Sequence, residues 1–441
     1  MSFPRYPAYK DSGVEWLGAV PGHWDVLALK KCFQIIGGST PKSDTDSFWD
    51  GDILWATPSD LSKRDSVYMN DTQRKITAIG LASCGTKLVP ARSIVLSTRA
   101  PIGSLAIAET EMCTNQGCKS LVPSEITDTE YFAHLLSISS TELNVRGKGT
   151  TFLELSGDEL GAFKTPVPSL PEQTQIAAFL DRETMKIDAL VAEQLRLMAL
   201  LKEKRQAVIS HAVTRGLNPD APMKPSGIEW LGDVPEHWEV LPAKRVSSVF
   251  VPQRNKPELN ANGDGHFWVT MEQMRSEEIN SAELSVTEDA AEDAGTRVLP
   301  AGAVVASCVG TFGLAAINNV DVIINQQLQA FIPTDRVDAK FLRHCVVIAE
   351  GYFEQIGTSA TVAYVNQLGF ANMPMVLPPR EEQHQIVEFL AAESAKFDTL
   401  TAEAQRATDL LQERRTALIS AAVTGQIDVR DFVNHTELES V

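Results

Sequence analysis

The sequence predicts an α+β protein in which two strand-rich domains are joined by two long antiparallel coiled-coil helices. Three observations predict this class. Whole segments of the chain recur in the same order. The first part of each copy has the short apolar runs that are typical of strands, and the last part has the apolar spacing of a long helix. An internal tandem duplication of this kind also predicts pseudo-twofold symmetry.

The duplication is visible in three pairs of segments. SGVEWLGAVPGHWDV at 12–26 returns as SGIEWLGDVPEHWEV at 226–240. EQTQI at 172–176 returns as EQHQI at 382–386, and the copies close with RQAVISHAVT at 205–214 and RTALISAAVT at 415–424. The interval between the copies is far longer than the repeat of a solenoid, so a whole module is duplicated. We expect strand-rich domains at 1–165 and 221–375, and helix regions at 166–220 and 376–441.

The first part of each module is rich in short apolar runs separated by Gly, Pro and Asn. SIVLST at 93–98, LAIA at 105–108 and AVVASC at 303–308 are examples, and they predict buried strands. The uncharged stretch 298–320 could suggest a membrane span, but Pro300, Gly302, Gly310 and Gly313 interrupt it. It is therefore expected to form strands joined by turns.

The second part of each module has apolar positions that alternate steps of four and three residues, the spacing of a coiled-coil seam. Ser169 with Glu172 predicts a helix start, and Gly216 and Gly425 predict the ends. The expected seam of the first helix consists of Ile176, Leu180, Glu183, Ile187, Leu190, Gln194, Leu197, Leu201, Lys204 and Val208. That of the second consists of Ile386, Leu390, Glu393, Phe397, Leu400, Ala404, Ala407, Leu411, Arg414 and Leu418.

Each seam contains one acidic and one basic residue, which suggests a register. An antiparallel arrangement that pairs Glu183 with Arg414 also pairs Lys204 with Glu393. The alternative is that all four side chains extend to solvent at the edge of the seam.

The charge of the chain is strongly acidic. There are 39 Lys and Arg residues against 57 Asp and Glu, a net charge of −18, and this alone disfavours a DNA partner. The excess is uneven, since residues 1–220 carry −3 and residues 221–441 carry −15. The six cysteines form no C-x-x-C pair and the N-terminus has no apolar signal segment. These features predict a cytoplasmic protein.

The motifs of common catalytic classes are missing from the sequence. It contains no G-x-x-x-x-G-K-[ST] phosphate loop, no G-x-S-x-G elbow, no E-x-K nuclease core and no N-P-P-[YF] methyltransferase tetrapeptide. The eight histidines have no metal-ligand spacing. His23 and His237 belong to the repeated P-x-H-W and are expected to be structural, as are the thiols of Cys113 and Cys118. We therefore predict a chain that is not an enzyme and has no metal site.

At this point the sequence resembles a known family, the specificity subunits of type I restriction-modification enzymes. The resemblance extends from about residue 8 to residue 427. Its markers, besides the repeats above, are GGSTPKSDTDSFWDGDILWATPSDL at 37–61, STRAPIGSLAIAETEMCTNQGCKSLVP at 97–123 and GKGTTFLELSGDEL at 147–160. The second copy departs most from the family pattern at 252–296, where the GGSTP-like opening is missing.

The resemblance implies two target-recognition domains, each reading half of a bipartite site in double-stranded DNA and held apart by the paired helices. It implies docking of two methyltransferase (modification) subunits on the helices and of restriction/translocase subunits in the complex. It implies no cofactor in this chain, with S-adenosylmethionine, ATP and Mg2+ on the partner subunits. No membrane association is implied.

The duplication indicates where DNA is read, because residues shared by two domains with different half-sites should be framework. Base-reading residues should lie where the copies diverge, with Arg, Asn and Gln suited to bases and Lys to phosphates. In the first copy the candidates are Lys42, Lys63, Arg64, Gln73, Arg74, Lys75, Arg146 and Lys148. In the second they are Gln253, Arg254, Asn255, Lys256, Arg275 and Tyr364. Thr150 and Thr358, in shared Gly-Thr pairs, are candidate phosphate contacts, although a plain turn is an equal alternative.

Three alternatives remain open at this stage. For each basic candidate, the alternative is an ordinary solvated surface charge. For the whole chain, the alternatives are a specificity module of a related fused restriction enzyme and a coiled-coil adaptor that binds proteins rather than DNA. The acidic charge fits the adaptor better.

Overall fold

The structure, a computed structural model, describes residues 3–62, 64, 66–149, 153–358 and 362–432. The chain divides into two compact units. Unit 1 comprises Met1–Gln194 and Arg406–Val441, and unit 2 comprises Leu195–Gln405. Each unit contains one strand-rich domain and part of each long helix, so unit 1 is built from two segments that are distant in sequence.

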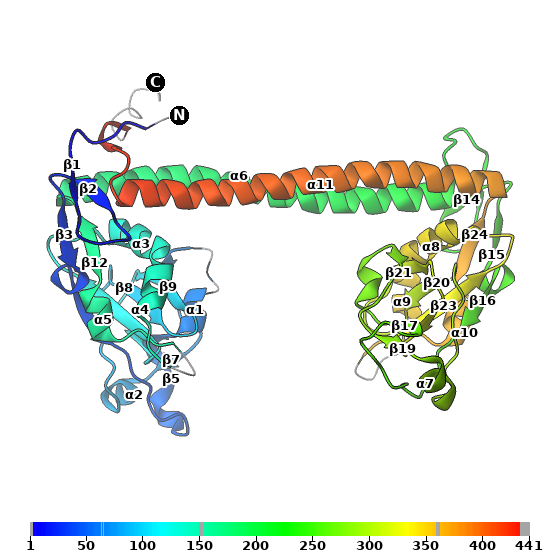
Figure 1. The fold of residues 1–441 in the computed structure, drawn as a ribbon, viewed down its shortest axis with the longest axis horizontal. Coiled ribbons are helices and arrows are strands. Elements are labelled where there is room, and N and C mark those ends of the chain that lie inside the picture. Colours follow the sequence, from blue (N-terminus) through cyan, green and yellow to red (C-terminus); the bar gives the residue numbers. More distant parts are fainter. Residues whose placement is uncertain (1–2, 63, 65, 150–152, 359–361, 433–441) are drawn as a thin grey trace. The chain divides into compact units, whose positions relative to one another are not determined.

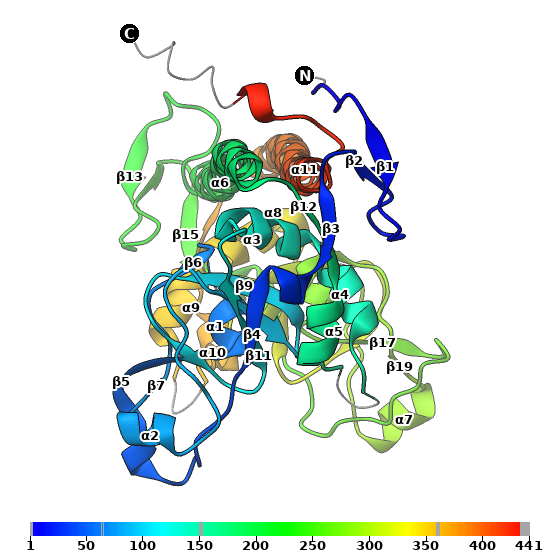
Figure 2. The same cartoon turned by 90° about the vertical axis from the view of Figure 1, so that its left-hand side faces the viewer.

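The domain of unit 1 is built on a five-stranded sheet with the order β4-β11-β8-β9-β6 (Figures 1 and 2). Its neighbours are antiparallel except β6 and β9, which are parallel. These strands are β4 (Phe33–Gly37), β6 (Tyr68–Met69), β8 (Ile94–Thr98), β9 (Ile102–Ala108) and β11 (Cys118–Pro123). All five residues of β8 are buried, as expected of a central strand covered on both faces.

Smaller elements surround this sheet. A three-stranded sheet has the order β10-β5-β7, and two pairs are β1-β2 and β12-β3. The strands are β1 (Tyr9–Asp11), β2 (Ala19–Pro21), β3 (Asp25–Ala28), β5 (Trp49–Ala56), β7 (Lys75–Ile76), β10 (Cys113–Thr114) and β12 (Lys164–Val167). The short helices are α1 (Pro58–Ser62), α2 (Ala78–Ala82), α3 (Thr129–Ile138), α4 (Ser140–Arg146) and α5 (Gly157–Ala162). Helix α3 lies on β9 and below the start of α6 (Leu170–Arg215) (Figure 2).

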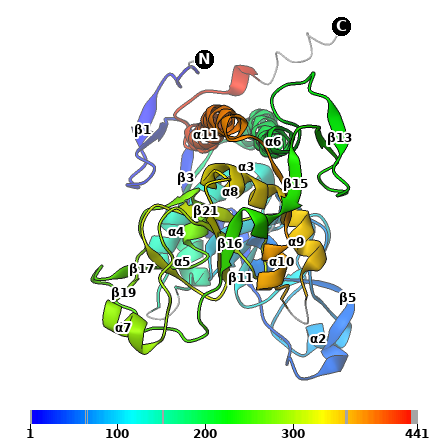
Figure 3. The ribbon, with the colours of Figure 1, turned by 90° about the vertical axis from the view of Figure 1, so that its right-hand side faces the viewer.

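Unit 2 has the same set of sheets as unit 1, with one counterpart for each strand, and Figure 3 shows this unit from its own side. Its five-stranded sheet has the order β16-β23-β20-β21-β18, and a three-stranded sheet has the order β19-β17-β22. The strands are β13 (Met223–Pro225), β14 (Asp233–Pro235), β15 (Glu239–Pro242), β16 (Ser247–Phe250), β17 (His266–Val269), β18 (Glu278–Ile279), β19 (Ser285–Val286), β20 (Val304–Ser307), β21 (Ala315–Asn318), β22 (Val322–Ile324), β23 (Leu328–Pro333) and β24 (Pro374–Leu377). The helices are α7 (Glu288–Asp293), α8 (Ala339–Ile348), α9 (Glu350–Ile356), α10 (Gln367–Ala371) and α11 (Arg380–Val423).

The predicted class is confirmed: mixed helices and strands, a duplicated module and two long helices packed antiparallel within each unit. The uncharged stretch 298–320 contains β20 and β21 separated by a turn, as expected. Among the described helices, none is long and apolar enough to cross a membrane. Helix α6 ends at Arg215 and α11 at Val423, and the predicted stop residues Gly216 and Gly425 both have a φ of 74°, which suits glycine at a helix end.

The two long helices run antiparallel in each unit, and equivalent ion pairs join them. In unit 1, Arg415 Nε lies 2.8 Å from Asp188 Oδ1. In unit 2, Arg205 Nη1 lies 2.6 Å from Asp398 Oδ1. The duplication relates Asp188 to Asp398 and Arg205 to Arg415, so one interaction occurs twice with the copies exchanged.

The predicted register is wrong in its pairs. Glu183 contacts Arg182 and Lys186, and Glu393 contacts Lys396 on its own helix. Lys204 and Arg414 are exposed. The ion pairs between the helices are formed instead by the residues that follow Lys204 and Arg414, together with Asp188 and Asp398.

The predicted seam takes two residues from every seven. One of the two is predicted correctly, and the other lies one residue further along the chain than predicted. Ile176, Leu180, Ile187, Ile386, Leu390 and Phe397 are buried, and Leu201 and Leu411 are half-buried. Leu190, Leu197 and Leu400 are 52%, 42% and 46% exposed. The positions that face inward are Thr184, Val191, Met198, Arg205, Thr401, Thr408 and Arg415.

The displacement has a geometric cause. The first turns of α6, at Ile176 and Leu180, pack into the core of the domain. The next inward residue is Thr184, four residues on, and Ile187 follows three later. The inward positions therefore take two steps of four from Ile176 to Thr184 and then alternate steps of three and four, as in a heptad repeat. The predicted pattern takes a step of three after Leu180 instead of four, and it therefore misses every second inward position by one residue.

The seam can be tested by comparing two neighbouring aliphatic residues. Ile187→Ala should lower the free energy of unfolding by about 2–4 kcal/mol because it leaves a cavity between the helices. Leu190→Ala, its control, should change it by less than about 0.5 kcal/mol because Leu190 is exposed. Urea denaturation of both variants measures the difference. Equal losses would contradict this seam and support the seam predicted from the sequence, which contains both residues.

Candidate nucleic-acid interface

Each strand-rich domain is fixed to a long helix by a glutamate in the first turn of that helix. Glu172 is buried, and its Oε1 accepts a hydrogen bond from Trp24 Nε1 at 3.0 Å. His23 Nε2 lies 3.0 Å from Glu172 Oε2. The helix begins at Leu170, close to the predicted start, but Glu172 binds the P-x-H-W segment rather than serving as a reciprocal cap with Ser169. The structural role expected for His23 is confirmed.

The next residue, Gln173, also connects the helix to the domain. We call the contacts of Glu172 and Gln173 with the domain the joint. The Gln173 side chain is fully buried, Oε1 accepts from the backbone N of Asp128 at 2.8 Å, and Nε2 donates to the carbonyls of Ile126 and Pro168. These bonds connect α6 with the loop that precedes α3. A buried amide with all these partners holds two elements in one arrangement.

The second copy repeats the joint group for group. Trp238 Nε1 donates to Glu382 Oε2 at 2.8 Å, and His237 Nε2 lies 2.7 Å from Glu382 Oε1. Gln383 accepts from the backbone N of Asp338 at 2.7 Å and donates to the carbonyls of Arg336 and Pro378. Because both copies keep these contacts, we interpret them as framework.

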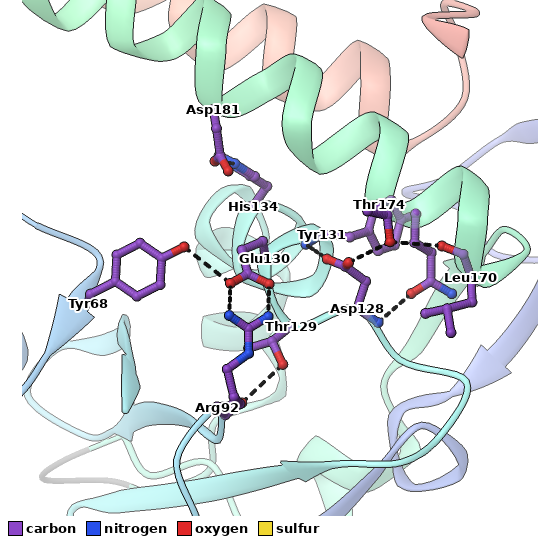
Figure 4. A network of polar contacts seen from close by, with 11 residues as sticks. Tyr68, Arg92, Asp128, Thr129, Glu130, Tyr131, His134, Leu170, Thr174 and Asp181 are labelled. Atoms are coloured by element: carbon purple, nitrogen blue, oxygen red, sulfur yellow. Dashed lines mark hydrogen bonds and ion pairs between the residues drawn. The ribbon is translucent and has the colours of Figure 1, made fainter. Parts of the chain in front are cut away.

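Further polar contacts surround the joint of unit 1 (Figure 4). Asp128 caps α3 by accepting from the backbone N of Tyr131, and it also accepts from the hydroxyl of Thr174 on α6. Glu130 forms a two-pronged ion pair with Arg92. It also accepts from the hydroxyl of Tyr68, whose pKa is raised to about 12 by burial and by this carboxylate.

Unit 2 has an ion network between domain and helices that has no counterpart at the equivalent positions in the described part of unit 1. Glu277 Oε1 lies 2.9 Å from Arg343 on α8 and 3.6 Å from Arg205 on α6, which in turn binds Asp398 on α11. The residues of unit 1 that correspond to Glu277 and Arg343 are Val67 and Ala133, which line a groove of about 460 Å³. The residue next to Arg343, His344, is buried within this region of unit 2.

The divergent loop of the first domain is held by tryptophans. Trp49 Nε1 donates to the carbonyl of Lys42 at 3.1 Å, and Trp55 Nε1 donates to the carbonyl of Ser39 at 3.0 Å. The guanidinium of Arg74 lies 3.6 Å from the centre of the Trp49 ring. The structure thus brings the predicted Lys42 and Arg74 together, with both side chains exposed.

In each domain, a glutamine that occurs in both copies attaches the divergent loop to the frame, by which we mean the sheets and helices that are alike in the two domains. In the first copy Gln116 bonds with the hydroxyl of Thr40. In the second, Gln326 Nε2 donates to the carbonyl of Gln253 at 2.9 Å. The preceding Asn makes the same local turn in both, since Asn115 Oδ1 accepts from the N of Gly117 and Asn325 Oδ1 from the N of Gln327. The expectation that the Asn-Gln pair is framework agrees with these contacts.

The remaining candidates of the first domain are engaged within the domain. Lys75 lies 3.0 Å from Asp71, and Lys148 lies 2.6 Å from Glu159. These lysines lower the pKa of the two carboxyl groups. Arg146 lies over the ring of Phe163 at 5.5 Å. Gln73 is exposed, Arg64 is half-buried and donates to the carbonyl of Tyr68, and Lys63 and Thr150 lie outside the described residues.

In the second domain the structure brings several candidates together. Gln253, Arg254, Asn255 and Lys256 are all exposed in the loop after β16. Tyr364 pairs with both Val309 and Thr358 in short backbone bridges. Burial raises the pKa of Tyr364, and the nearby charge of Arg254 acts to lower it. Arg275 is exposed at the end of a separate 3-10 helix (Gln273–Arg275).

Two further arginines, Arg99 and Arg297, lie beside these loops and are absent from the residues predicted from the sequence. A Cβ on Gly117 would lie 3.0 Å from Arg99 Nε, so this half-buried arginine lies against the Asn115 turn. Its counterpart in the second copy is Val309, a divergence that could have identified it. The guanidinium of Arg297 lies 4.8 Å from the ring centre of Phe250, at the start of the divergent loop of the second domain.

The exposed side chains of the two divergent loops are mostly polar or basic. They present guanidinium, amide, ammonium and hydroxyl groups, and no group of three or more potential metal ligands occurs in the described part of the chain. Cys113 and Cys118 are buried, which raises the pKa of each thiol to about 12. The geometry defines a class of protein with two similar frames that carry different polar loops.

Comparison with known proteins identifies that class. A family model for the type I restriction modification DNA specificity domain matches residues 21–195 and 235–407. The chain therefore belongs to this family. The predicted membership is confirmed, and with it the prediction of a non-catalytic specificity subunit.

Relatives and solved structures agree with this assignment. The chain is 37% identical over 166 residues to the MjaIX specificity subunit of Methanocaldococcus jannaschii, covering 37% of this chain and 38% of the relative. It is 28% identical over 184 residues to the EcoR124I/EcoR124II specificity subunit of Escherichia coli, covering 40% and 42%. These two alignments span about two-fifths of each relative. The MjaVIII specificity subunit of M. jannaschii is 22% identical over 441 residues, with 94% and 95% covered.

Two solved structures share the fold. A chain from a study of complex assembly and conformational transition of the type I R-M system has a TM-score of 0.71 at 16% identity, covering 92% of this chain and 98% of that chain. The HsdS subunit from Thermoanaerobacter tengcongensis has a TM-score of 0.52 at 17% identity, with the same coverage.

The joint can be tested with a pair of glutamines on α11. Gln383→Leu keeps the size of the side chain but leaves the backbone N of Asp338 without its acceptor, so we expect a loss of about 2–3 kcal/mol in the free energy of unfolding. Gln385→Leu changes the same residue type at an exposed position, and should cost less than about 0.5 kcal/mol. Denaturant unfolding distinguishes the two. Equal stability of both variants would contradict the role given to the joint.

His344 makes unit 2 sensitive to acid. Burial, followed by the charges of Arg343 and Arg205, lowers its pKa to about 3. An unfolded histidine binds a proton near pH 6.5. The stability that depends on neutral His344 is therefore complete above pH 6.5 and declines as the pH falls towards 3.

His344→Gln should reduce this acid sensitivity. Unfolding in urea at pH 7.5 and pH 5.0 should show a smaller difference for the variant than for the unchanged chain. The same difference in both proteins would show that His344 is not the responsible group.

Proposed function

We propose that this chain is the DNA sequence-specificity subunit of a type I restriction-modification complex and that it recognises a bipartite site, one half-site per domain. One observation supports this most strongly. Two domains with the same frame carry different polar loops, at 39–54 and at 252–267. A protein that binds one ligand twice would keep its contact loops alike, whereas one that reads two different half-sites must vary them.

The residues exposed on these loops suit bases and phosphates. Arg254, Asn255 and Gln253 can form paired hydrogen bonds with guanine or adenine edges in the major groove. Lys42 and Lys256 are suited to phosphate oxygens. The ion pairs of Lys75 and Lys148 are exposed, so phosphates could replace their carboxylate partners at little energetic cost.

The proposal extends to the partner subunits. Helices α6 and α11 expose leucines at equivalent positions: Leu190 and Leu400 are 52% and 46% exposed, and Leu200 and Leu410 are 52% and 59% exposed. Isolated exposed leucines are ordinary. A set that recurs at equivalent positions of both copies instead favours two copies of one partner, and we assign these positions to two modification subunits.

The assembled complex would supply everything that this chain lacks. S-adenosylmethionine would bind to the modification subunits, and ATP and Mg2+ to the restriction/translocase subunits, in the cytoplasm. The net charge of −18 implies weak binding to DNA by the isolated chain. A second candidate function, a protein-binding adaptor, is favoured by the same charge. The two differ in that only a specificity subunit changes the methylated DNA motif.

Arg254 provides a direct test of base reading. Arg254→Ala should relax one position of one half-site, since a paired contact to a base discriminates by about 1–3 kcal/mol. Mapping methyladenine in cells that carry the complete system measures the motif. Arg380→Ala, which removes an exposed arginine at the start of α11, should leave the motif unchanged. Equal weakening at all sequences would assign Arg254 to a phosphate instead.

Partner docking is tested at the equivalent leucines. Leu190→Asp and Leu400→Asp together should reduce co-purification of the modification subunit at least tenfold, because each places a charge in an apolar contact. Leu190→Ala does not disturb folding by our first prediction, so a loss with aspartate can be separated from unfolding by measuring Tm. Undiminished assembly of a stable double variant would contradict docking at this surface.

A further inference from the structure

In unit 1, the rings of three phenylalanines pack against one another on the surface of α6 near its start. Phe179 is buried, and its ring centre lies 5.4 Å from that of Phe3 and 6.3 Å from that of Phe432. The rings of Phe3 and Phe432 are 5.3 Å apart and nearly perpendicular. The segment after α11 thus folds back and covers Phe179 together with the N-terminal segment.

Hydrogen bonds fix this cover. Arg182 Nη1 donates to the carbonyl of Phe432 at 3.1 Å, and the backbone N of Asp428 donates to the carbonyl of Pro4 at 2.8 Å. Val429, between them, is fully buried. Residues 427–432 therefore bind to the surface of α6 within the same chain, much as a separate peptide would.

Unit 2 has two of the three members of this cluster. Aligning EQTQI with EQHQI places Phe389 at the position of Phe179, and aligning the two P-x-H-W segments places Leu217 at the position of Phe3. No residue corresponds to Phe432, because the chain passes from α6 through Gly216 directly into the second domain. The first copy therefore has, after Gly216, no equivalent of the segment that follows Gly425 in the second copy.

The missing member leaves an open groove. Phe389 is 39% exposed and Leu217 is 42% exposed. They line a groove of about 510 Å³ together with Ala207, Val208, Lys204 and His211. Its floor is apolar and its rim carries the ammonium of Lys204. In unit 1 the covering segment carries Asp428, which is paired with Arg430 of the same segment at 2.6 Å, and Asp431, which directly precedes Phe432. An aromatic residue with an acidic neighbour therefore matches the apolar floor of the groove and the ammonium of Lys204.

We propose that this groove of unit 2 is a docking site for an extended segment of a partner protein that presents a phenylalanine beside acidic residues. The aromatic ring takes the place that Phe432 has in unit 1 and packs edge-on against Phe389, as Phe432 does against Phe179. This site is separate from the recognition loops and does not require DNA. It makes the two copies unequal, because one groove is closed by the chain itself and the other is closed by a partner.

A peptide with the sequence of the covering segment of unit 1 can serve as a probe for this site. A fluorescein-labelled peptide with the sequence of residues 424–432, TGQIDVRDF, should bind the full-length chain saturably in a fluorescence anisotropy titration. The same peptide with Phe432→Ala should bind at least tenfold more weakly. Phe389→Ala in the chain should weaken the binding of the unchanged peptide to a similar extent, and Lys204→Glu should weaken it further.

Leu368→Ala is the matched control, since it removes an exposed apolar side chain of unit 2, on α10, outside the groove. It should leave binding unchanged, and equal Tm values for the chain variants should confirm that they fold. Binding that is absent at millimolar concentrations, or that is unaffected by Phe389→Ala, would overturn the proposal. A concentration-dependent dimer that Phe389→Ala abolishes would also overturn it, because the occupant would then be a second copy of this chain.

Discussion

The arrangement of each unit depends on the Glu-Gln pair in the first turn of its long helix. Glu172 and Glu382 hold the indole of the P-x-H-W segment, and Gln173 and Gln383 hold the loop before α3 or α8. These side chains are buried or half-buried, and an unpartnered buried polar group is costly. The polar contacts therefore specify one orientation of the domain on its helix, while apolar packing supplies most of the stability.

Because both copies keep the same joint, the two domains can share one arrangement of sheets and helices and still carry different loops. The loops that differ between the copies are attached to the frame by the shared Gln116 and Gln326, so their sequences can change without disturbing the sheets beneath. The acidic excess does not oppose this arrangement. It lies mainly in residues 221–441, where Glu277 and Asp398 are used internally by the ion network around Arg205.

The sequence predicts the fold well because the duplication supplies an internal comparison. Both helix ends, the strands at 298–320 and the structural role of the P-x-H-W histidines follow from local patterns. The seam is only half predicted, because Ile176 and Leu180 pack on the domain and displace the later heptads. That displacement depends on tertiary packing, which periodicity alone does not contain.

The candidate site is predicted less completely, since contacts between distant segments decide which charges are available. The ion pairs of Lys75 and Lys148 and the stacking of Arg74 on Trp49 join residues whose proximity the sequence does not reveal. Arg99 was missed because it lies between segments with shared sequence, although its counterpart Val309 differs in chemistry. Comparing the copies position by position is therefore more informative than comparing whole loops.

The central claim is that the frame is common and that each domain carries its own half-site. Replacing residues 239–379 by a second copy of residues 25–169 tests it most directly, because both junctions fall in segments that the copies share. The methyladenine map of cells carrying this chain in the complete system should show the half-site of the first domain twice and lose the other half-site. A motif that still contains both original half-sites would contradict the account.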